Sequence, residues 1–379
     1  MGTIVPAITA DSKEIKTRKE VGNMVLDLNG SPYEMGKKHG EVMREQIVEN
    51  VGIVRNVIEN IKKMDMDVYM KHVYRNMEFV KQDRPDSAEE MQGLADGAGV
   101  PLDDIYLLNV QLFIQAQLLS DECMTMIARA PATLDGKTYM IKTRDIFTHM
   151  RHVVTRRHYP SGVDICEVNP VGAILWPGNG FNSYGLMVAT TGAATTNMPE
   201  MDLSVSRRGH VTVNPNYVLQ ACKNVDEVID YIKNKHGPRI FRVNFFAVDH
   251  ERAVCIEMSE DKLVVCDADQ DGLLFRSNYW RSEEFKAYRP IREENPNNYG
   301  RYEAAETFLR ARVGQIRFQD MLEIAQHHDR DGKDGSSICR HGAGGTSVST
   351  YSSLIVLEDR DMFTALRNPC EALVRSEAK

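Results

Sequence analysis

Long apolar runs are absent from this chain of 379 residues, and the absence excludes a membrane-spanning helix, which needs about 18 consecutive apolar residues. An excess of positive charge is absent too: the formal net charge is −8, which excludes a general basic surface for nucleic acid. The seven cysteines form no pairs at metal-ligand spacing, and their odd number argues against a disulfide framework. Residues 1–19 lack the apolar segment of a secretory signal. We therefore expect a cytoplasmic protein with no membrane partner, no nucleic-acid partner and no metal.

Core-forming residues, by contrast, are plentiful. The hydrophobic content is 42%, and the length suits roughly two or three domain-sized units or one large layered domain. No internal repeat and no long low-complexity linker marks a boundary between such units.

The first third of the chain is typical of successive helices. Ser31-Pro32-Tyr33-Glu34 combines a capping serine, a proline in the first turn and a glutamate three places on, which predicts a helix start. Apolar residues at helical spacing predict one long helix over 47–61. Further helices are predicted over 68–81, from a Ser87 cap to about Gly99, and from Pro101 to Leu119.

The remainder is mixed and rich in strands. Residues 133–137 predict a turn before a strand over 139–143, and 241–248 with 253–258 predict a hairpin. Further predicted elements are strands over 262–267 and 350–357, and helices within 217–235, 302–312 and 318–327.

The change from helices to strands falls at Cys123. If the bond between Glu122 and Cys123 is cut, Cys123 carries both a thiol and a free α-amine. That pair is a nucleophile with its own base, the arrangement of N-terminal nucleophile enzymes.

Cys123, followed by Thr125, belongs to a set of short segments that keep a definite order along the chain. The others are 30–36 with His39-Gly40, 143–145, 181–186, 277–279, 337–341, 350–355 and 368–370. Together these segments resemble the acyl-coenzyme A:isopenicillin N acyltransferase family of N-terminal nucleophile hydrolases, which also includes hydrolases of N-acyl amines.

The resemblance implies an α+β fold, a four-layer αββα sandwich with two antiparallel sheets between helices. It also implies self-cleavage between Glu122 and Cys123. The products would be a helical N-terminal fragment, 1–122, and a catalytic fragment, 123–379, which stay bound as a heterodimer. The sequence leaves any higher oligomer open.

The family's roles transfer to four residues. Cys123 would be the nucleophile, and its freed α-amine would be the base, because an N-terminal amine has a pKa of about 7.7–8.0. Asn278 would donate its side-chain amide to the oxyanion. Asp145 would hold the α-amine or polarise the site, and Thr125 would hydrogen-bond near the thiol.

The implied reaction is acyl transfer from a small-molecule amide to water or an amine through an acyl-cysteine. We favour hydrolysis, because no clustered Lys/Arg segment suits the phosphates of coenzyme A, and we expect no cofactor. Arg340 and Arg144 are candidates to pair with a substrate carboxylate. The identity of the acyl and amine groups stays open, since several positions depart from the family pattern: Glu122, Met124, Thr143 and Tyr279.

Two alternatives remain. One is a hydrolase without self-cleavage, in which His341 activates Cys123 or Cys339. The other is a non-catalytic binding protein on the same scaffold. His327 and His328 are a weak metal signal, because adjacent residues of a helix point about 100° apart.

Overall fold

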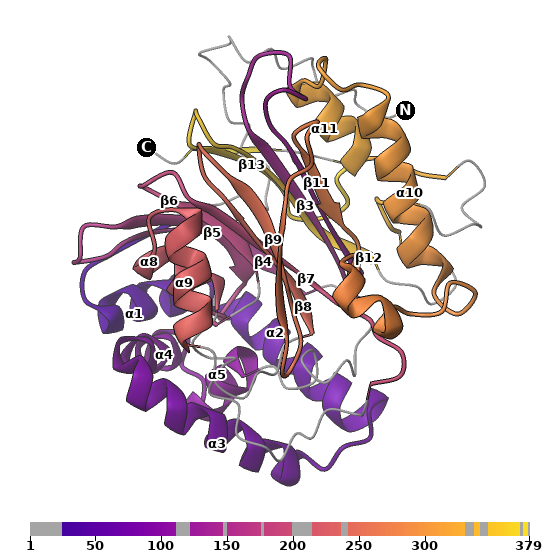
Figure 1. The fold of residues 1–379 in the computed structure, drawn as a ribbon. Helices are drawn as coiled ribbons and strands as arrows, with labels where there is room; N and C mark the ends of the chain where they lie inside the picture. The colour runs from indigo at the N-terminus through magenta and orange to yellow at the C-terminus, as the bar shows by residue number, and fades with distance from the viewer. Residues whose placement is uncertain are drawn as a thin grey trace.

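The computed structural model describes residues 25–110, 122–146, 150–175, 178–198, 214–235, 242–329, 337–341, 348–371 and 374–377. These residues form two β-sheets that lie face to face between layers of helices (Figure 1). None of the described helices is both long and apolar enough to span a membrane.

The strands of the eight-stranded sheet follow chain order without β2 and β3, whereas the six-stranded sheet places β11 beside β2. The eight-stranded sheet runs β1 (Val25–Asn29), β4 (His152–His158), β5 (Asp164–Pro170), β6 (Asn179–Asn182), β7 (Met187–Gly192), β8 (Val243–Val248), β9 (Ala253–Met258) and β10 (Leu263–Asp267). The six-stranded sheet runs β11 (Leu273–Arg276), β2 (Glu122–Ala128), β3 (Tyr139–Ile146), β12 (Val348–Val356), β13 (Asp361–Ala365) and β14 (Val374–Glu377). Among these pairs only β1 and β4 run parallel.

The helices divide between the outer faces. The N-terminal group is α1 (Pro32–Val42), α2 (Arg44–Asn56), the π-helical η1 (Val57–Ile61), α3 (Met66–Asp83), α4 (Pro85–Ala98) and α5 (Leu102–Asn109). Helices α8 (Pro215–Ala221) and α9 (Val225–Lys235) contact the eight-stranded sheet. Helices α10 (Pro296–Arg310) and α11 (Phe318–Ala325), after the 3-10 helix η2 (Glu283–Tyr288), contact the six-stranded sheet.

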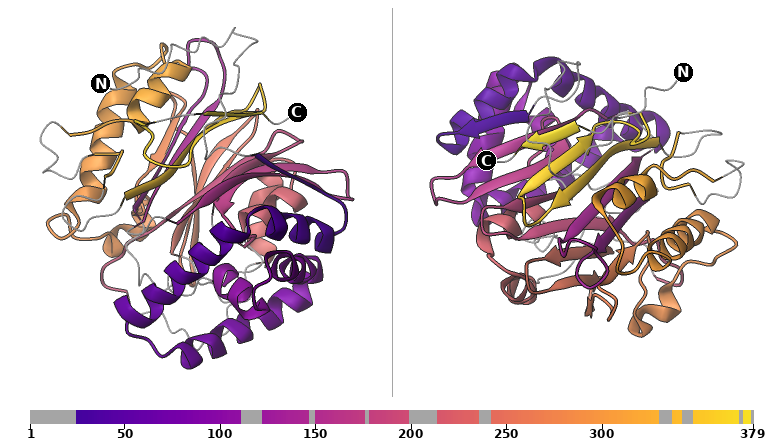
Figure 2. Two further views of the ribbon diagram at one scale, coloured as in Figure 1. Left: turned by 180° about the vertical axis from the view of Figure 1, so that it is seen from behind. Right: turned by 90° about the horizontal axis from the view of Figure 1, so that it is seen from above.

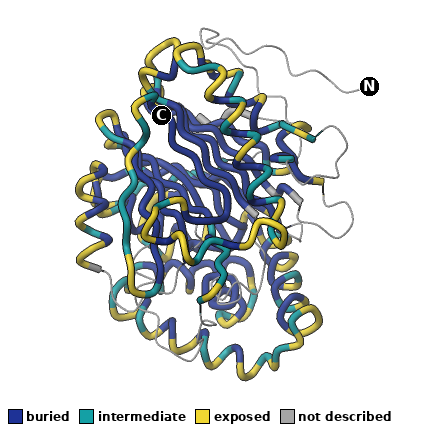
Figure 3. Tube along the Cα trace, turned by 45° about the vertical axis from the view of Figure 1, so that its right-hand side comes forward, coloured by how far each residue is buried: buried dark blue, intermediate teal, exposed yellow. Residues whose placement is uncertain are grey.

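The layer order confirms the expected αββα class. Side chains of both sheets share one apolar cluster between them, to which β2 contributes Ile127 and β8 contributes Phe246. Separate clusters lie between each sheet and its helices. Figure 2 shows the two sheets from further sides, and Figure 3 shows that their strands are the buried centre of the molecule, with exposed residues mostly on the outer helices.

The N-terminal segment is mostly helical, as predicted, but it also completes a sheet. Strand β1 pairs in parallel with β4 at the edge of the eight-stranded sheet. A buried ion-pair cluster adds a second link, because Arg157 of β4 pairs with Glu90 of α4 and with Glu167 of β5. The segments before and after Cys123 are therefore interlocked.

Helices α1 and α4 approach each other closely through glycines. Gly36 and Gly40 of α1 face α4, and Gly93 and Gly97 of α4 face α1. A Cβ atom on Gly93 would lie 2.1 Å from the carbonyl oxygen of Tyr33, closer than any real contact, so this packing requires glycine.

Most of the local predictions are confirmed. Ser31 caps α1: its Oγ accepts a hydrogen bond from the Glu34 N–H at 3.3 Å, and the Glu34 carboxylate accepts from the Ser31 N–H. The predicted hairpin is β8 and β9, paired antiparallel. The predicted helix over 68–81 is α3.

Several predicted helices differ from the structure in their bounds. The long helix predicted over 47–61 is α2 followed by a π-helical turn, rather than one regular helix. Helix α4 begins at Pro85, so Ser87 lies inside the helix and does not cap it. The helix within 217–235 is two helices, α8 and α9, because α8 ends at Ala221 and Cys222 is extended. The predicted helix from Pro101 ends at Asn109, and its remainder lies outside the described residues.

Candidate active site

Strands β2 and β3 place the predicted residues on two faces of the six-stranded sheet. Met124 and Met126 pack toward α10 and α11, whereas Ile127 packs between the sheets. Because successive side chains of a strand alternate, Cys123 and Thr125 lie on the side of Ile127, between the sheets.

The same alternation places Arg144 and Asp145 of β3 on opposite faces. Arg144 is paired directly with Cys123 across the antiparallel ladder, so the two side chains share the inter-sheet face. Asp145 faces the helix layer instead. All three residues are buried.

Asn278, which follows β11, contacts the backbone of Cys123. Its Oδ1 accepts a hydrogen bond from the Cys123 N–H at 2.6 Å, and its Nδ2 donates to the carbonyl of Gly192 at 3.1 Å. These contacts fix the amide next to the nitrogen that self-cleavage would turn into an α-amine. The Asn278 side chain thus links the start of β2 to the end of β7.

Arg301 of α10 holds this arrangement together, and the sequence analysis did not single it out. One guanidinium nitrogen donates to the Cys123 carbonyl at 3.2 Å and to the Asp145 carboxylate at 3.3 Å. The second terminal nitrogen donates to Asn278 Oδ1 at 2.9 Å and to Asn298 Oδ1 at 3.0 Å. Arg301 is fully buried. The structure therefore brings Cys123, Asp145 and Asn278 together around one cation.

Asp145 is fixed from its other side by Ser349 of β12. The Ser349 Oγ donates to the Asp145 carboxylate at 2.6 Å and accepts from the Arg340 N–H at 2.9 Å. The Arg340 carbonyl in turn accepts from the Ser349 N–H at 2.9 Å and from the Asn368 side chain. Arg340 is thus joined to the site through its backbone, and its side chain is buried.

Polar groups surround the thiol side of β2. The buried Thr125 hydroxyl has no hydrogen-bond partner among the described residues. Lys142 of β3 stands opposite Thr125 in the ladder, is fully buried and donates to the carbonyl of Thr190 in the other sheet. Cys123 is therefore flanked by a lysine and an arginine on its own face, a feature that the sequence analysis noticed only for Arg144.

The predicted alternative pair also lies close together. Cys339 Sγ lies 3.6 Å from His341 Nε2, and neither residue has a described contact with Cys123. Burial raises the pKa of the Cys339 thiol to about 12. His341 is exposed and lies beside two further side chains, His328 and Cys370.

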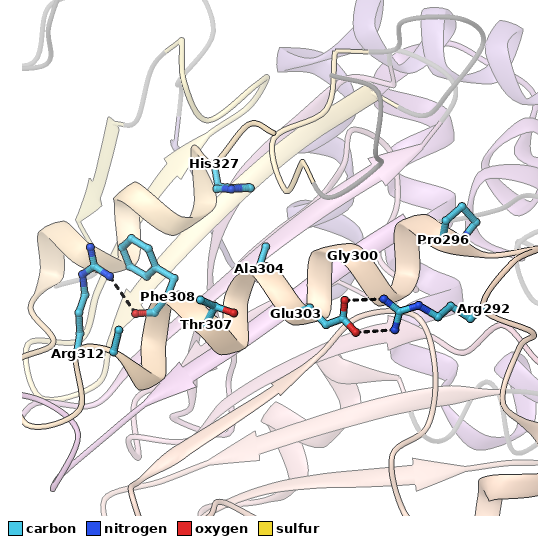
Figure 4. A pocket seen from close by; sticks show the side chains of 10 residues that line it. Arg292, Pro296, Gly300, Glu303, Ala304, Thr307, Phe308, Arg312 and His327 are labelled. Atoms are coloured by element: carbon cyan, nitrogen blue, oxygen red, sulfur yellow. Dashed lines mark hydrogen bonds and ion pairs between the residues drawn. The ribbon is translucent and has the colours of Figure 1, made fainter. Parts of the chain in front are cut away.

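A groove of about 660 Å³ runs along the outer face of α10 (Figure 4). Its lining includes Gly300, Thr307 and His327, and also Arg292 and Glu303, which form an ion pair. Arg301 points from the same helix toward the sheet. The groove is thus separated from Cys123 by the helix itself and contains none of the predicted catalytic residues.

Comparison with known proteins gives matches among curated proteins and solved structures. No protein-family model matches the chain. The 40 kDa form of acyl-coenzyme A:6-aminopenicillanic-acid-acyltransferase from Emericella nidulans is 25% identical over 163 residues, which cover 42% of this chain and 44% of that protein. The chain therefore spans less than half the length of the curated relative that it matches.

Two solved structures align with much of this chain but share little sequence with it. A mutant of conjugated bile acid hydrolase from Clostridium perfringens is 10% identical, with a TM-score of 0.44, covering 68% of this chain and 97% of that one. Penicillin V acylase from Agrobacterium tumefaciens is 13% identical, with a TM-score of 0.41, covering 64% and 82%. The curated match confirms that this chain resembles the acyl-coenzyme A:isopenicillin N acyltransferase family of N-terminal nucleophile hydrolases.

Proposed function

We propose that this protein is a self-processing N-terminal-cysteine amidohydrolase or acyltransferase that acts on an N-acyl amine or N-acyl amino acid. One observation supports this more than any other: the Cys123 nitrogen contacts Asn278, while Arg301 joins the Cys123 carbonyl to Asp145 and Asn278. Polar groups that hold both sides of one cysteine backbone are what a chain needs if that cysteine is to become a catalytic N-terminus.

Self-cleavage would begin with the Cys123 thiolate attacking the Glu122 carbonyl carbon. The Glu122–Cys123 amide bond breaks, its nitrogen takes a proton, and residues 1–122 are left as a thioester on Cys123. Water then attacks the thioester, which releases the Glu122 carboxylate and regenerates the thiol. The products are the two fragments and the free α-amine of Cys123.

Turnover would use the same atoms. The α-amine accepts the thiol proton, and sulfur attacks the substrate carbonyl to give a tetrahedral oxyanion. Collapse expels the amine, which takes the proton, and leaves an acyl-cysteine that water or a second amine resolves. Asn278 uses one N–H for Gly192, and its second N–H is the candidate oxyanion donor, an interaction typically worth roughly 2.7–4 kcal/mol.

Asp145 and Arg301 would act as positioning residues. Asp145 faces away from the thiol, so its influence on Cys123 passes through the Arg301 guanidinium. Arg301 also orients Asn278 by donating to Oδ1. Thr125, whose hydroxyl lies buried on the thiol side, is the candidate partner for the sulfur or the substrate.

Arg144 and Lys142 favour a substrate with an anionic group near the scissile amide, because both cations share the inter-sheet face with Cys123. Arg340 is a weaker candidate for the same role, since it reaches the site through its backbone. The fragments would stay bound as a heterodimer through the β1–β4 pairing and the Glu90–Arg157 ion pair. We place the enzyme in the cytoplasm on its cysteine content.

Mass spectrometry with an electrophilic acyl probe tests the proposal. The active preparation is expected to contain fragments 1–122 and 123–379, with the probe on Cys123. Cys123→Ala is expected to stay whole, remain unlabelled and hydrolyse nothing, whereas the control Cys266→Ser is expected to behave like the natural protein. Labelling of another cysteine in a fully active sample would overturn the proposal.

The contact between Cys339 and His341 is the specific observation for a second candidate, a Cys-His hydrolase that is not cleaved. In that enzyme, His341→Ala would abolish activity and leave the chain's processing state unchanged. A binding protein without catalysis would instead keep its biological effect in the Cys123→Ala variant.

A further inference from the structure

Four potential metal ligands converge outside the candidate catalytic site. His328 follows α11, Cys339 and His341 lie in the short segment before β12, and Cys370 follows β13. Their ligand atoms all lie within 4.8 Å of one another. His341 Nε2 lies 3.1 Å from His328 Nε2, 3.6 Å from Cys339 Sγ and 3.4 Å from Cys370 Sγ. The two sulfur atoms are 3.5 Å apart.

Four of the six separations among the ligand atoms match the edges of a tetrahedron around one ion. With zinc–sulfur bonds of about 2.3 Å and zinc–nitrogen bonds of about 2.0–2.1 Å, the edges of a tetrahedral site run from about 3.3 Å for two nitrogens to about 3.8 Å for two sulfurs. Each of the four measured separations lies within a few tenths of an ångström of the corresponding edge.

A supporting contact has the form expected around such a site. The Asn368 side-chain amide donates to Cys339 Sγ at 3.5 Å, and the same amide group donates to the Arg340 carbonyl. Hydrogen bonds of this kind orient a thiolate ligand and compensate part of its charge. Cys339 is buried, whereas the other three ligands are exposed, so an ion could enter from solvent.

We propose that His328, Cys339, His341 and Cys370 bind one divalent ion of the zinc class. Two thiolates and two imidazoles are a donor set that suits zinc, and four protein ligands make a closed, structural site rather than a catalytic one. The proposal departs from the sequence-based expectation of no metal. That expectation weighed His328 only against its neighbour His327, whereas its partners come from two other segments.

The site would hold the segment that borders the catalytic residues. Cys339 and His341 flank Arg340, whose N–H donates to Ser349 Oγ, and Ser349 donates to Asp145. An ion bound to both flanking residues, and to Cys370 and His328, would tie this segment to the end of α11 and to the chain after β13. Its role is therefore to keep Ser349 and Asp145 in register.

Elemental analysis of the full-length protein, purified under reducing conditions without added metal, tests the proposal. About one zinc per chain is expected for the natural protein, and less than about 0.2 for Cys370→Ser and His328→Ala. The control Cys266→Ser, in β10, is expected to keep its metal. Equal zinc in all four proteins, or a Cys339–Cys370 disulfide found by mass spectrometry in metal-free protein, would overturn the assignment.

Cobalt substitution tests the site in the natural protein, so its result does not depend on whether the ligand variants fold. Natural protein stripped by a chelator and loaded with Co²⁺ is expected to show the visible absorption of a tetrahedral sulfur–nitrogen site, which zinc abolishes by displacement. An octahedral or absent spectrum contradicts the site. Because Cys123→Ala should bind the same amount of metal, this result stands or falls separately from the proposed catalytic function.

Discussion

Replacing Arg301 by methionine is expected to lower the free energy of unfolding of the uncut chain by about 3–5 kcal/mol, the usual effect of breaking a buried ion pair. The magnitude follows from what the side chain satisfies. Arg301 is fully buried and donates to the Asp145 carboxylate, the Asn278 and Asn298 side chains and the Cys123 carbonyl. Methionine has a similar volume, so the cavity contribution is small and the effect reports the lost polar contacts.

Urea unfolding is best measured in a Cys123→Ala background, because the chain then stays whole and fragment dissociation does not make the transition depend on concentration. Arg310→Met is the matched control on the same helix. The side chain of Arg310 is 42% exposed and pairs with Asp269, so its loss is expected to change stability by less than about 1 kcal/mol.

A double-mutant cycle between Arg301→Met and Asp145→Asn then measures the interaction free energy of the two side chains. Coupling of at least about 1 kcal/mol is expected, since each single change removes this ion pair and leaves the other charge buried. If the two effects add within about 0.5 kcal/mol, Arg301 does not link Asp145 to Cys123 in the way described here. In the Cys123-containing chain, Arg301→Met is also expected to block processing.

Three further changes have expected outcomes. Gly93→Ala should lower the unfolding free energy in urea by about 1–3 kcal/mol or more, because its Cβ would clash with α1. An added Cβ at Gly52 has no neighbour within 4 Å, so Gly52→Ala should be neutral or stabilising. If both variants lose the same unfolding free energy, the close packing of α1 and α4 is not the cause. Burial lowers the pKa of both His39 and His152 to about 3. The folded protein keeps each imidazole neutral, whereas the unfolded chain protonates it below a pKa of about 6.5. Each histidine therefore lowers the free energy of unfolding by about 2 kcal/mol as the pH drops to 5. The His39→Gln and His152→Gln variants should each flatten the stability–pH curve between pH 6.5 and 5, and an unchanged slope contradicts this. Arg144→Gln should raise the KM for a carboxylate-bearing amide about tenfold, with little effect on a neutral analogue, since a charge-assisted hydrogen bond is worth about 1.5 kcal/mol or more; equal effects on both would exclude its binding role.

Local features of the fold could be predicted because their causes are local. The Ser31 capping box and the hairpin of β8 and β9 depend on residues a few places apart, and both are found. The position of Cys123 at the start of a strand followed from the change in sequence pattern. The order of strands within the sheets could not be derived in this way, because it depends on contacts between distant segments.

Arg301 shows why part of the site was missed. The predicted helix began at Tyr302, whereas α10 begins at Pro296, so Arg301 lay outside every predicted element. Two signals could have found it: proline at the first helical position, and Asn298 three residues before Arg301 on one helix face. Its contact with Cys123 joins residues 178 positions apart, which no local pattern encodes.

The metal-ligand cluster was missed for a similar reason. Ten residues separate His328 from Cys339, and Cys370 lies much further on, so no usual ligand spacing appears in the sequence. Only the packing of α11 against the strands brings these side chains to one point.

Cys123 is proposed to work as an N-terminal residue, so the N-terminus of the active protein is the direct test. Intact-mass measurement and N-terminal sequencing of an enzymatically active preparation should show a fragment that begins at Cys123 and carries the acyl group during turnover. A fully active preparation in which the bond between residues 122 and 123 is whole in every molecule would contradict the account.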